Sequence, residues 1–195
     1  MNETVFKTFG DVATVTTGYS FRGKAESNDS SSGVRVLQIK DIKEGVLVNG
    51  EDLPYANTGT GKTIPLLAYD QILMPLRGER QAALLISTNL ESLKLTTTQQ
   101  VAIITINSDL ILPSYLHWYL NSEMFKADIL KLKTGMAIKS LTLKGLAAVK
   151  VPVPVIYNQE KIVQLYNLWK REQKVLNEML INGSHLTEAM CKELF

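Results

Sequence analysis

The segment from Ala56 to Thr63 reads ANTGTGKT, and it is the nearest that this chain comes to a motif with chemistry of its own. It fits a permissive phosphate-loop pattern, in which backbone N–H groups and a lysine hold phosphates while a hydroxyl holds magnesium. The flanks do not suit that use, because the polar stretch EDLPY precedes the motif and Ile64-Pro65 follows it, where a buried strand and a long helix are needed. We therefore expect an exposed loop that carries Lys62 toward a backbone phosphate, with nucleotide hydrolysis by Lys62 and Thr63 as the alternative.

Residues that could act as soft metal ligands or nucleophiles are few and scattered: Cys191, His117 and His185. A zinc site needs such ligands at short spacing, and a cysteine nucleophile needs a histidine beside it. His117 stands between Leu116 and Trp118 in a segment that looks helical, so a packed or surface histidine is the expected role. The acidic residues show no recognisable pairing, and we expect neither a metal site nor a catalytic centre in this chain.

Side chains suited to binding nucleic acid are more numerous. Arginine and lysine can pair with guanine edges and glutamine with adenine, although most such residues contact phosphates or solvent. The candidates are Arg22, Lys24, Lys62, Arg77, Arg80, Gln99, Gln100, Lys133 and Lys139. Between Asp128 and Glu160 the chain also has no acidic residue, while five lysines fall there. This local basic field suits an anionic partner, and a solvated lysine-rich face is the alternative.

Composition sets only broad limits. The chain has 195 residues, a net charge of +2, 45% hydrophobic residues and 21% charged residues, which is ordinary for a globular protein of one or two domains. The single cysteine excludes an intrachain disulfide. The first residues do not resemble a signal peptide, and no apolar run approaches the roughly 18 residues of a membrane span, so we expect a cytoplasmic location.

The segments that must position these side chains indicate an α+β fold over residues 1–155. Residues 9–18 look like a short helix or turn followed by a strand, and residues 24–33 and 56–63 look like exposed loops. Alternating or β-branched runs predict strands at residues 34–39, 71–76, 82–87, 98–106 and 149–155, with a small strand inside 41–50. Pro152 and Pro154 restrict the last of these to a sheet edge or an exit from the sheet.

One helix is predicted over residues 113–132. Pro113-Ser114 is a typical start signal, and Gly135 marks the end. The apolar stripe that would face the core runs through Leu116, Leu120, Met124 and Leu130.

The remainder, residues 156–195, is predicted to be a single amphipathic helix. Its apolar residues alternate at spacings of 3 and 4, with Glu172 and Gly183 in the gaps, which is the pattern of two helices wound together. The seam consists of Ile162, Leu165, Trp169, Leu176, Met179, Leu186 and Met190. At 1.5 Å per residue, the 38 residues from Asn158 onward would reach about 57 Å. Packing of this helix on its own head, and a bend at Asn182-Gly183-Ser184, are the alternatives.

An ordered set of short segments resembles the specificity (S) subunit of type I restriction-modification systems over nearly the whole chain. The resemblance rests on Phe9–Val12 with Thr17–Phe21, Val36–Ile42 with Gly45, Ile72–Met74 with Arg77-Gly78, Pro113–Leu116 with Leu120–Ser122, Gly135, Ile138, Leu141 and Leu146, Val151–Pro154, and Gln159–Ile162. In two respects the chain departs from the family. Asp70-Gln71 stands where a Gly-Asp turn is expected, and one recognition unit is present where family members usually carry two. The resemblance therefore implies a half-size subunit, or a fragment, that must dimerise.

The resemblance also implies a division of labour. Residues 1–155 would be a DNA-binding target recognition domain, and residues 156–195 a conserved-region helix for dimerisation and subunit docking. The partners would be double-stranded DNA, a methyltransferase (M) subunit using S-adenosylmethionine to methylate adenine, and a restriction (R) subunit using ATP and magnesium, with no cofactor in this chain. An antiparallel homodimer would read an inverted, bipartite sequence whose spacer is at most about 17 base pairs at 3.4 Å each. A coiled-coil scaffold without DNA contact is the competing hypothesis.

Overall fold

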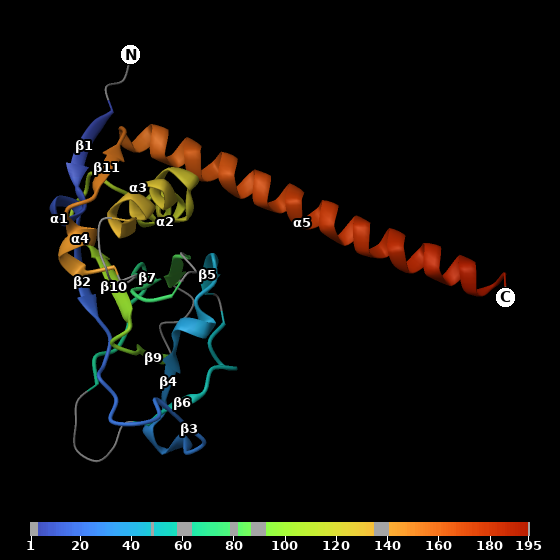
Figure 1. Cartoon of the computed structure of the whole chain (residues 1–195), viewed down its shortest axis with the longest axis horizontal. Helices are drawn as coiled ribbons and strands as arrows, with labels where there is room; N and C mark the ends of the chain where they lie inside the picture. Colours follow the sequence, from blue (N-terminus) through green and yellow to red (C-terminus); the bar gives the residue numbers. More distant parts are fainter. Residues whose placement is uncertain are drawn as a thin grey trace.

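A globular head carries one long helix, α5, that projects away from it (Figure 1). The computed structural model describes residues 4–47, 49–57, 64–78, 82–86, 93–134 and 141–194, with the backbone alone for residues 131–134. The head combines mixed sheets with short helices, so the predicted α+β class is confirmed.

A five-stranded sheet forms the centre of the head, in the order β2-β10-β7-β8-β5. The strands are β2 (Ala13–Thr17), β10 (Val101–Ile106), β7 (Ile72–Pro75), β8 (Leu84–Ile86) and β5 (Gly45–Leu47). Strand β10 lies between β2 and β7 and pairs antiparallel with both. Its first four residues, VAII, are all buried, as expected for a strand covered on both faces.

A second sheet of four strands extends the head at the end away from α5 (Figure 1). Its order is β3 (Glu26–Ser27), β6 (Tyr55–Ala56), β4 (Val34–Leu37) and β9 (Lys94–Thr97), and β4 and β9 run parallel. A third pair consists of β1 (Val5–Thr8) and β11 (Lys150–Val153). Pro152 therefore lies in an edge strand and Pro154 directly follows that strand, which agrees with the predicted sheet edge or exit.

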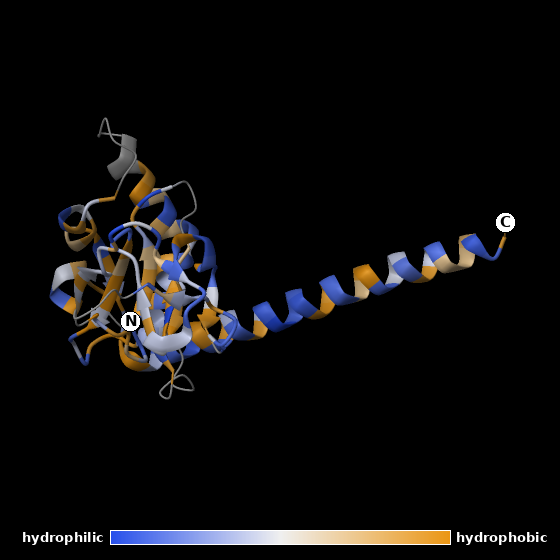
Figure 2. Ribbon diagram, turned by 90° about the horizontal axis from the view of Figure 1, so that it is seen from below, coloured by the Kyte–Doolittle hydropathy of each residue, from blue (hydrophilic) through white to orange (hydrophobic). Residues whose placement is uncertain are grey.

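Helices cover the central sheet and enclose the main core. They are α1 (Phe9–Val12), α2 (Pro113–Asn121), α3 (Glu123–Thr134) and α4 (Leu143–Ala147), with 3-10 turns at Ser30–Ser32 and Ile39–Asp41. The core packs Tyr115, Tyr119 and Phe125 of the helices against Ile72 and Ile104 of the sheet. Figure 2 shows the corresponding concentration of hydrophobic residues inside the head.

The predicted single helix over 113–132 is wrong, because the chain breaks at Ser122. The backbone of Ser122 is extended, and its hydroxyl donates to Tyr119 O and accepts from Phe125 N. The break resets the helical phase, so Phe125 and Ile129 are buried while the predicted Met124 and Leu130 are 58% and 60% exposed. Only Leu116 and Leu120 of the predicted stripe reach the core.

The predicted strand 98–106 is also too long. Strand β10 begins at Val101, residues Gln99 and Gln100 form a turn, and a separate strand, β9, precedes that turn. Lys94–Thr97 was not predicted as a strand. Strands β7, β8 and β11 fall within their predicted segments, and β4 ends at Leu37, two residues before the predicted end.

Helix α5 runs unbroken from Ile156 to Lys192, so the alternative of a bend at Gly183 is wrong. Ser184 and Thr187 donate their hydroxyls to Leu180 O and Gly183 O, at 3.0 and 2.9 Å, which fits residues inside a regular helix. The alternative of packing on its own head holds only for the first turns, because residues 167–194 are all exposed. Within the described residues, no helix is long and apolar enough to cross a membrane.

Candidate nucleic-acid interface

The turn at Gln99 and Gln100 joins the second sheet to the central one. Val101 N donates to Thr98 O to close the turn, at 3.0 Å. Gln99 N donates to Tyr19 O and Leu76 N donates to Gln100 O, both at 2.9 Å, so neighbouring strands hold both glutamines by their main chains. The two carboxamide side chains are exposed and remain available for a ligand.

Gly18 allows the chain after β2 to lie directly against this turn. A Cβ at Gly18 would lie 2.3 Å from Thr97 O and 2.6 Å from Thr98 O, closer than atoms can approach. The contact is therefore possible only with glycine. It lets Tyr19 N donate to Thr97 O at 2.7 Å and so fixes the position of the glutamine turn.

A concavity of about 360 Å³ lies on one side of the turn. It is lined by Tyr19, Phe21, Gly23, Lys24, Ala25, Gln38, Ile39, Lys40, Thr98, Gln99 and Gln100. Tyr19 and Phe21 pack edge to face, with ring centroids 4.9 Å apart, and supply an aromatic wall. Lys40 and Gln38 both bind Glu26, at 3.0 Å, and the hydrogen bond from Lys40 holds the pKa of Glu26 below its usual value. Lys24 is exposed at the edge of this concavity.

A second concavity, of about 330 Å³, lies on the other side of the turn. It is lined by Leu76, Arg77, Gln99, Gln100, Leu141, Thr142 and Leu143. Arg77 is exposed two residues after β7, and Gly78 has a φ of 91°, a backbone conformation that glycine adopts readily. Leu141 N donates to Leu76 O at 3.0 Å, which brings the start of α4 against the strand.

The structure therefore gathers four of the predicted DNA-binding residues around one surface. Gln99 and Gln100 line both concavities, Lys24 lines the first and Arg77 the second. Arg22 is exposed in the same loop as Lys24 but lines neither concavity. Lys62, Arg80 and Lys139 lie outside the described residues, and only the backbone of Lys133, on α3, is described.

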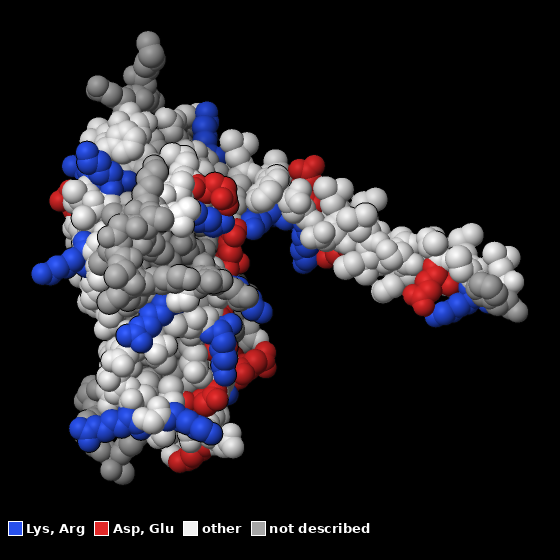
Figure 3. All heavy atoms as spheres, in the orientation of Figure 1, with Lys and Arg blue, Asp and Glu red and all other residues white. Residues whose placement is uncertain are grey.

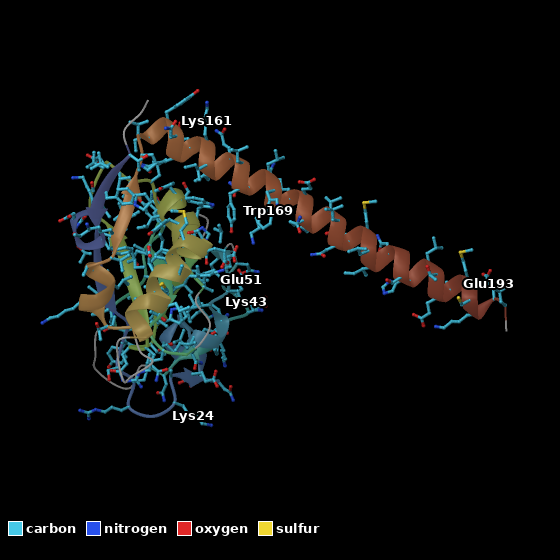
Figure 4. All side chains as sticks on the ribbon, turned by 45° about the horizontal axis from the view of Figure 1, so that its top comes forward. Lys24, Lys43, Glu51, Lys161, Trp169 and Glu193 are labelled. Atoms are coloured by element: carbon cyan, nitrogen blue, oxygen red, sulfur yellow. The ribbon has the colours of Figure 1, made fainter. Side chains whose placement is uncertain are left out.

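Several lining residues were missed in the sequence. Lys40 and Gln38 follow β4 at a 3-10 turn. In the sequence they appear only as polar residues near the end of a predicted strand, which does not indicate a binding role. Tyr19 and Phe21 are half-buried and line the first concavity, and Phe21 also packs against a small core cluster of Val34, Val36 and Ala56. Figure 4 shows Lys24 at the end of the head away from Lys161 and the start of α5.

Basic side chains spread over the face of the head shown in Figure 3 and extend to its lower end. Acidic side chains on that face lie mostly toward the side that carries α5. The described residues that line the two concavities beside the glutamine turn include Lys24, Lys40 and Arg77 and no acidic residue, which suits an anionic ligand.

The buried polar residues of the head do not belong to this surface. His117 is 5% exposed and lies 3.1 Å from Ala83 O through Nε2, and burial lowers its pKa. Asn121 accepts from Ala83 N and donates to Ala83 O, which ties α2 to the start of β8. Both side chains are structural. In the described part of the chain, no three His, Cys, Asp or Glu residues lie close enough to hold a metal ion.

The predicted seam of α5 forms a second candidate surface. Leu165, Trp169, Leu176, Met179, Leu186 and Met190 are all exposed, and Figure 2 shows hydrophobic residues recurring along the helix. Ile162 was predicted to belong to this seam, but it packs half-buried against the main core of the head together with Val163. The seam that can meet a partner therefore begins at Leu165.

Comparison with known proteins gives one consistent family. A family model for the type I restriction modification DNA specificity domain matches residues 1–166. The type I restriction enzyme EcoBI specificity subunit of Escherichia coli is 26% identical over 180 residues, which cover 86% of this chain and 36% of that subunit.

Solved structures share the fold at low identity. The HsdS subunit from Thermoanaerobacter tengcongensis superposes with a TM-score of 0.61 and 15% identity, over 87% of this chain and 38% of that one. A chain from a structure described as the basis of complex assembly and conformational transition of the type I R-M system has a TM-score of 0.66 and 16% identity, over 89% and 40%. The present chain thus spans less than half the length of the proteins it matches.

Proposed function

Because this chain belongs to the type I restriction-modification DNA specificity family, we propose that it recognises a DNA sequence on behalf of partner enzymes. The head would read bases, and α5 would join the head to the rest of the assembly. Methylation and cleavage would be carried out by a methyltransferase subunit and a restriction subunit, and this chain would contribute no catalytic group.

The observation that carries the proposal is the glutamine turn between two concavities. Gln99 and Gln100 present carboxamides, which can form paired hydrogen bonds with adenine edges in the major groove. Lys24 and Arg77 lie on opposite sides of the turn, where they can contact phosphates and hold the duplex in register. Base-reading groups flanked by phosphate-binding groups are what sequence recognition requires.

The first experiment is a base-modification map of the host genome with and without the gene. Loss of methylation at one bipartite adenine motif would support recognition and the methyltransferase partner together, and unchanged motifs would contradict both.

Once the motif is known, binding of the pure chain to that DNA is measured by fluorescence anisotropy over a range of salt concentrations. Affinity should fall steeply with salt, because phosphate contacts release counterions. A flat salt response would favour the scaffold without DNA contact.

Substitutions then distinguish residues that recognise bases from residues that bind phosphates. The Gln99→Ala, Gln100→Ala double variant should lose preference for the motif over unrelated DNA by roughly 10-fold or more, as expected for lost base contacts of about 1–3 kcal/mol. Arg77→Ala should weaken binding to all sequences alike and reduce the salt slope by about 1. Gln173→Ala and Arg171→Ala, on exposed positions of α5, are the matched controls. Equal motif preference in the glutamine variant and its control would contradict the assignment.

We further propose that α5 pairs with α5 of a second copy, antiparallel, about a centre between residues 177 and 178. In that register each seam residue faces a seam residue of the second copy: Leu176 faces Met179, Trp169 faces Leu186 and Leu165 faces Met190. The two gaps in the seam then coincide, since Glu172 faces Gly183. A shift by one heptad would instead place Glu172 against Leu176 or Met190, which buries a carboxylate against an apolar side chain.

This pairing sets the separation of the two heads. The starts of the two helices would lie about 64 Å apart at 1.5 Å per residue, which corresponds to about 19 base-pair rises as an upper bound on the spacer. Identical heads related by a twofold axis would read an inverted repeat. In a Cys191→Ser background, Leu176→Cys and Met179→Cys chains should form a disulfide far more readily when mixed than when either is alone. Equal cross-linking in all three samples would contradict the register.

A further inference from the structure

Helix α5 is anchored to the head at its first turn by Gln159. This side chain has no exposed surface, and its carboxamide accepts from Leu112 N at 2.8 Å. It also donates to Leu110 O and Pro154 O, both at 2.7 Å. Because Gln159 holds only the first turn, it fixes where the helix starts. The direction of the helix then depends on contacts further along it.

A second anchor lies two turns further along, where Glu44 of the head meets Tyr166 and Lys170 of α5. Glu44 stands just before β5, and its Oε1 accepts from the Tyr166 hydroxyl and lies 2.5 Å from Lys170 Nζ. The side chains of Glu44 and Lys170 are 33% and 43% exposed, so the group is partly shielded from water. Burial by itself would raise the pKa of Glu44, but the hydrogen bonds from Lys170 and Tyr166 and the charge of Lys170 bring it below its usual value.

Aromatic packing on α5 stiffens this contact. The rings of Tyr166 and Trp169 lie 6.1 Å apart, and Lys170 Nζ lies 5.5 and 5.4 Å from the two ring centres. Trp169 thereby links the anchor to the exposed seam, to which it also belongs. The carboxylate of Glu44 is thus bound by Tyr166 and Lys170, whose side chains are in turn positioned by packing against each other and against Trp169.

The direction of α5 matters because the helix is a long lever. Cys191 lies about 48 Å beyond Gln159 at 1.5 Å per residue, so a tilt of about 10° would move it by about 8 Å. Such a displacement exceeds two base-pair rises of 3.4 Å. Ile162 and Val163 pack against the core between the two anchors, and the contact at Glu44 lies further along the helix, where it opposes tilting with a longer lever arm.

We propose that Glu44 is a positioning residue, which sets the direction in which α5 leaves the head and thereby the spacing at which paired heads read the two halves of a target. The proposal rests on the recognition function proposed above. The loss of Glu44 would leave the glutamine turn and its two concavities intact, since Glu44 lines neither of them. Substitution of Glu44 should therefore change the spacing between two paired heads without changing how one head recognises its half-site.

The direction of α5 can be measured directly, because the chain has one cysteine, Cys191, exposed near the end of the helix. Thr16→Cys, on an exposed position of β2, provides a second dye site on the head. Single-molecule energy transfer at subnanomolar concentration reports the distance within one chain. Glu44→Ala should broaden or shift the distribution, Glu44→Gln should do so less because it keeps a partner for Tyr166, and Glu51→Ala, at an exposed position of the head, should match the wild type. A Glu44→Ala distribution identical to the wild type would overturn the proposal.

The functional readout is the spacer length in the base-modification map. A strain carrying Glu44→Ala should methylate sites whose spacers differ by one or more base pairs from the wild-type motif, while the affinity of one head for a half-site stays within about twofold. An unchanged spacer preference would overturn the positioning role. Failure of the wild-type chain to bind or direct methylation would instead contradict the recognition function, and the energy-transfer result would still decide whether Glu44 directs the helix.

Discussion

Gln159 shows how a single polar side chain joins the two parts of this molecule. Its three hydrogen bonds join the first turn of α5 to main-chain groups of the head, at Leu110 and Leu112 before α2 and at Pro154 after β11. Gln159→Ala would leave those groups buried without partners, so we expect it to lower the free energy of unfolding by about 3 kcal/mol. Urea denaturation followed by circular dichroism measures the change. The control is Gln164→Ala, exposed on the same helix, whose effect should stay within about 0.5 kcal/mol.

His117 makes the stability of the head depend on pH. Burial lowers its pKa in the folded state below the value of about 6.5 that it has when unfolded. As the pH falls below about 6.5 toward the folded value, the unfolded chain binds more protons, so acid destabilises the fold. His117→Gln, which retains a donor for Ala83 O, should show a smaller loss of stability between pH 7 and pH 5 than the wild type.

The chain contains its own control for this prediction. His185 is the other histidine and is exposed on α5, so His185→Gln should retain the wild-type loss of stability on acidification. Unfolding by urea at the two pH values measures all three proteins. An equal loss in His117→Gln and the wild type would assign the acid sensitivity to groups other than His117.

Among the structural elements, the β9–β10 turn depends on the close approach of Gly18. Gly18→Ala would force its Cβ against Thr97 O and Thr98 O, which are main-chain atoms that cannot move alone. We expect a loss of about 1–3 kcal/mol in stability, with weaker DNA binding because the glutamine turn is displaced. Gly10→Ala is the matched control, since its Cβ would meet Ala147 at an ordinary 3.5 Å. Equal behaviour of the two variants in unfolding and anisotropy would contradict the role of Gly18.

Helix α5 illustrates why element type and element partner are separate questions. Its length and its seam follow from local spacing, and the structure has the helix unbroken through Gly183. The first turns find their partners within the head, through Gln159, Ile162 and the contacts of Tyr166 and Lys170 with Glu44, whereas the described side chains after Lys170 are exposed. The boundary between the two regions depends on how far the folded head extends along the helix. The local spacing of apolar residues in the sequence does not predict that distance.

At the scale of the whole molecule, the exposed seam predicts self-association. Leu176→Lys would bury a charge at the centre of the proposed antiparallel pair, so the dimer should dissociate at least 10-fold more readily. Sedimentation equilibrium over a concentration series measures the change in dissociation constant. Ile181→Lys is the control, because Ile181 is exposed on the same helix but lies outside the seam. A monomeric wild type, or equal effects of the two lysines, would show that α5 does not pair in this way.

The sequence by itself determined what short-range patterns encode. Alternation located most strands, the 3–4 spacing located the long helix, and ordered short motifs indicated the family that the comparison with known proteins then showed. The break at Ser122 was missed, because a residue compatible with a helix there uses its hydroxyl as a cap. The turn at Gln99 and Gln100 was read as strand, because it lies between threonines and the apolar run of β10, both of which favour strands.

Only the tertiary structure decided which side chains meet. Lys24, Arg77 and the two glutamines come from separate loops, and they surround one surface because β2, β7 and β10 are neighbours in the sheet. Glu44 and Tyr166 are 122 residues apart, and their contact exists because α2 holds the start of α5 above the central sheet. Contacts at such separations depend on how the elements pack, so they follow from the folded chain as a whole and leave no periodic trace in the sequence.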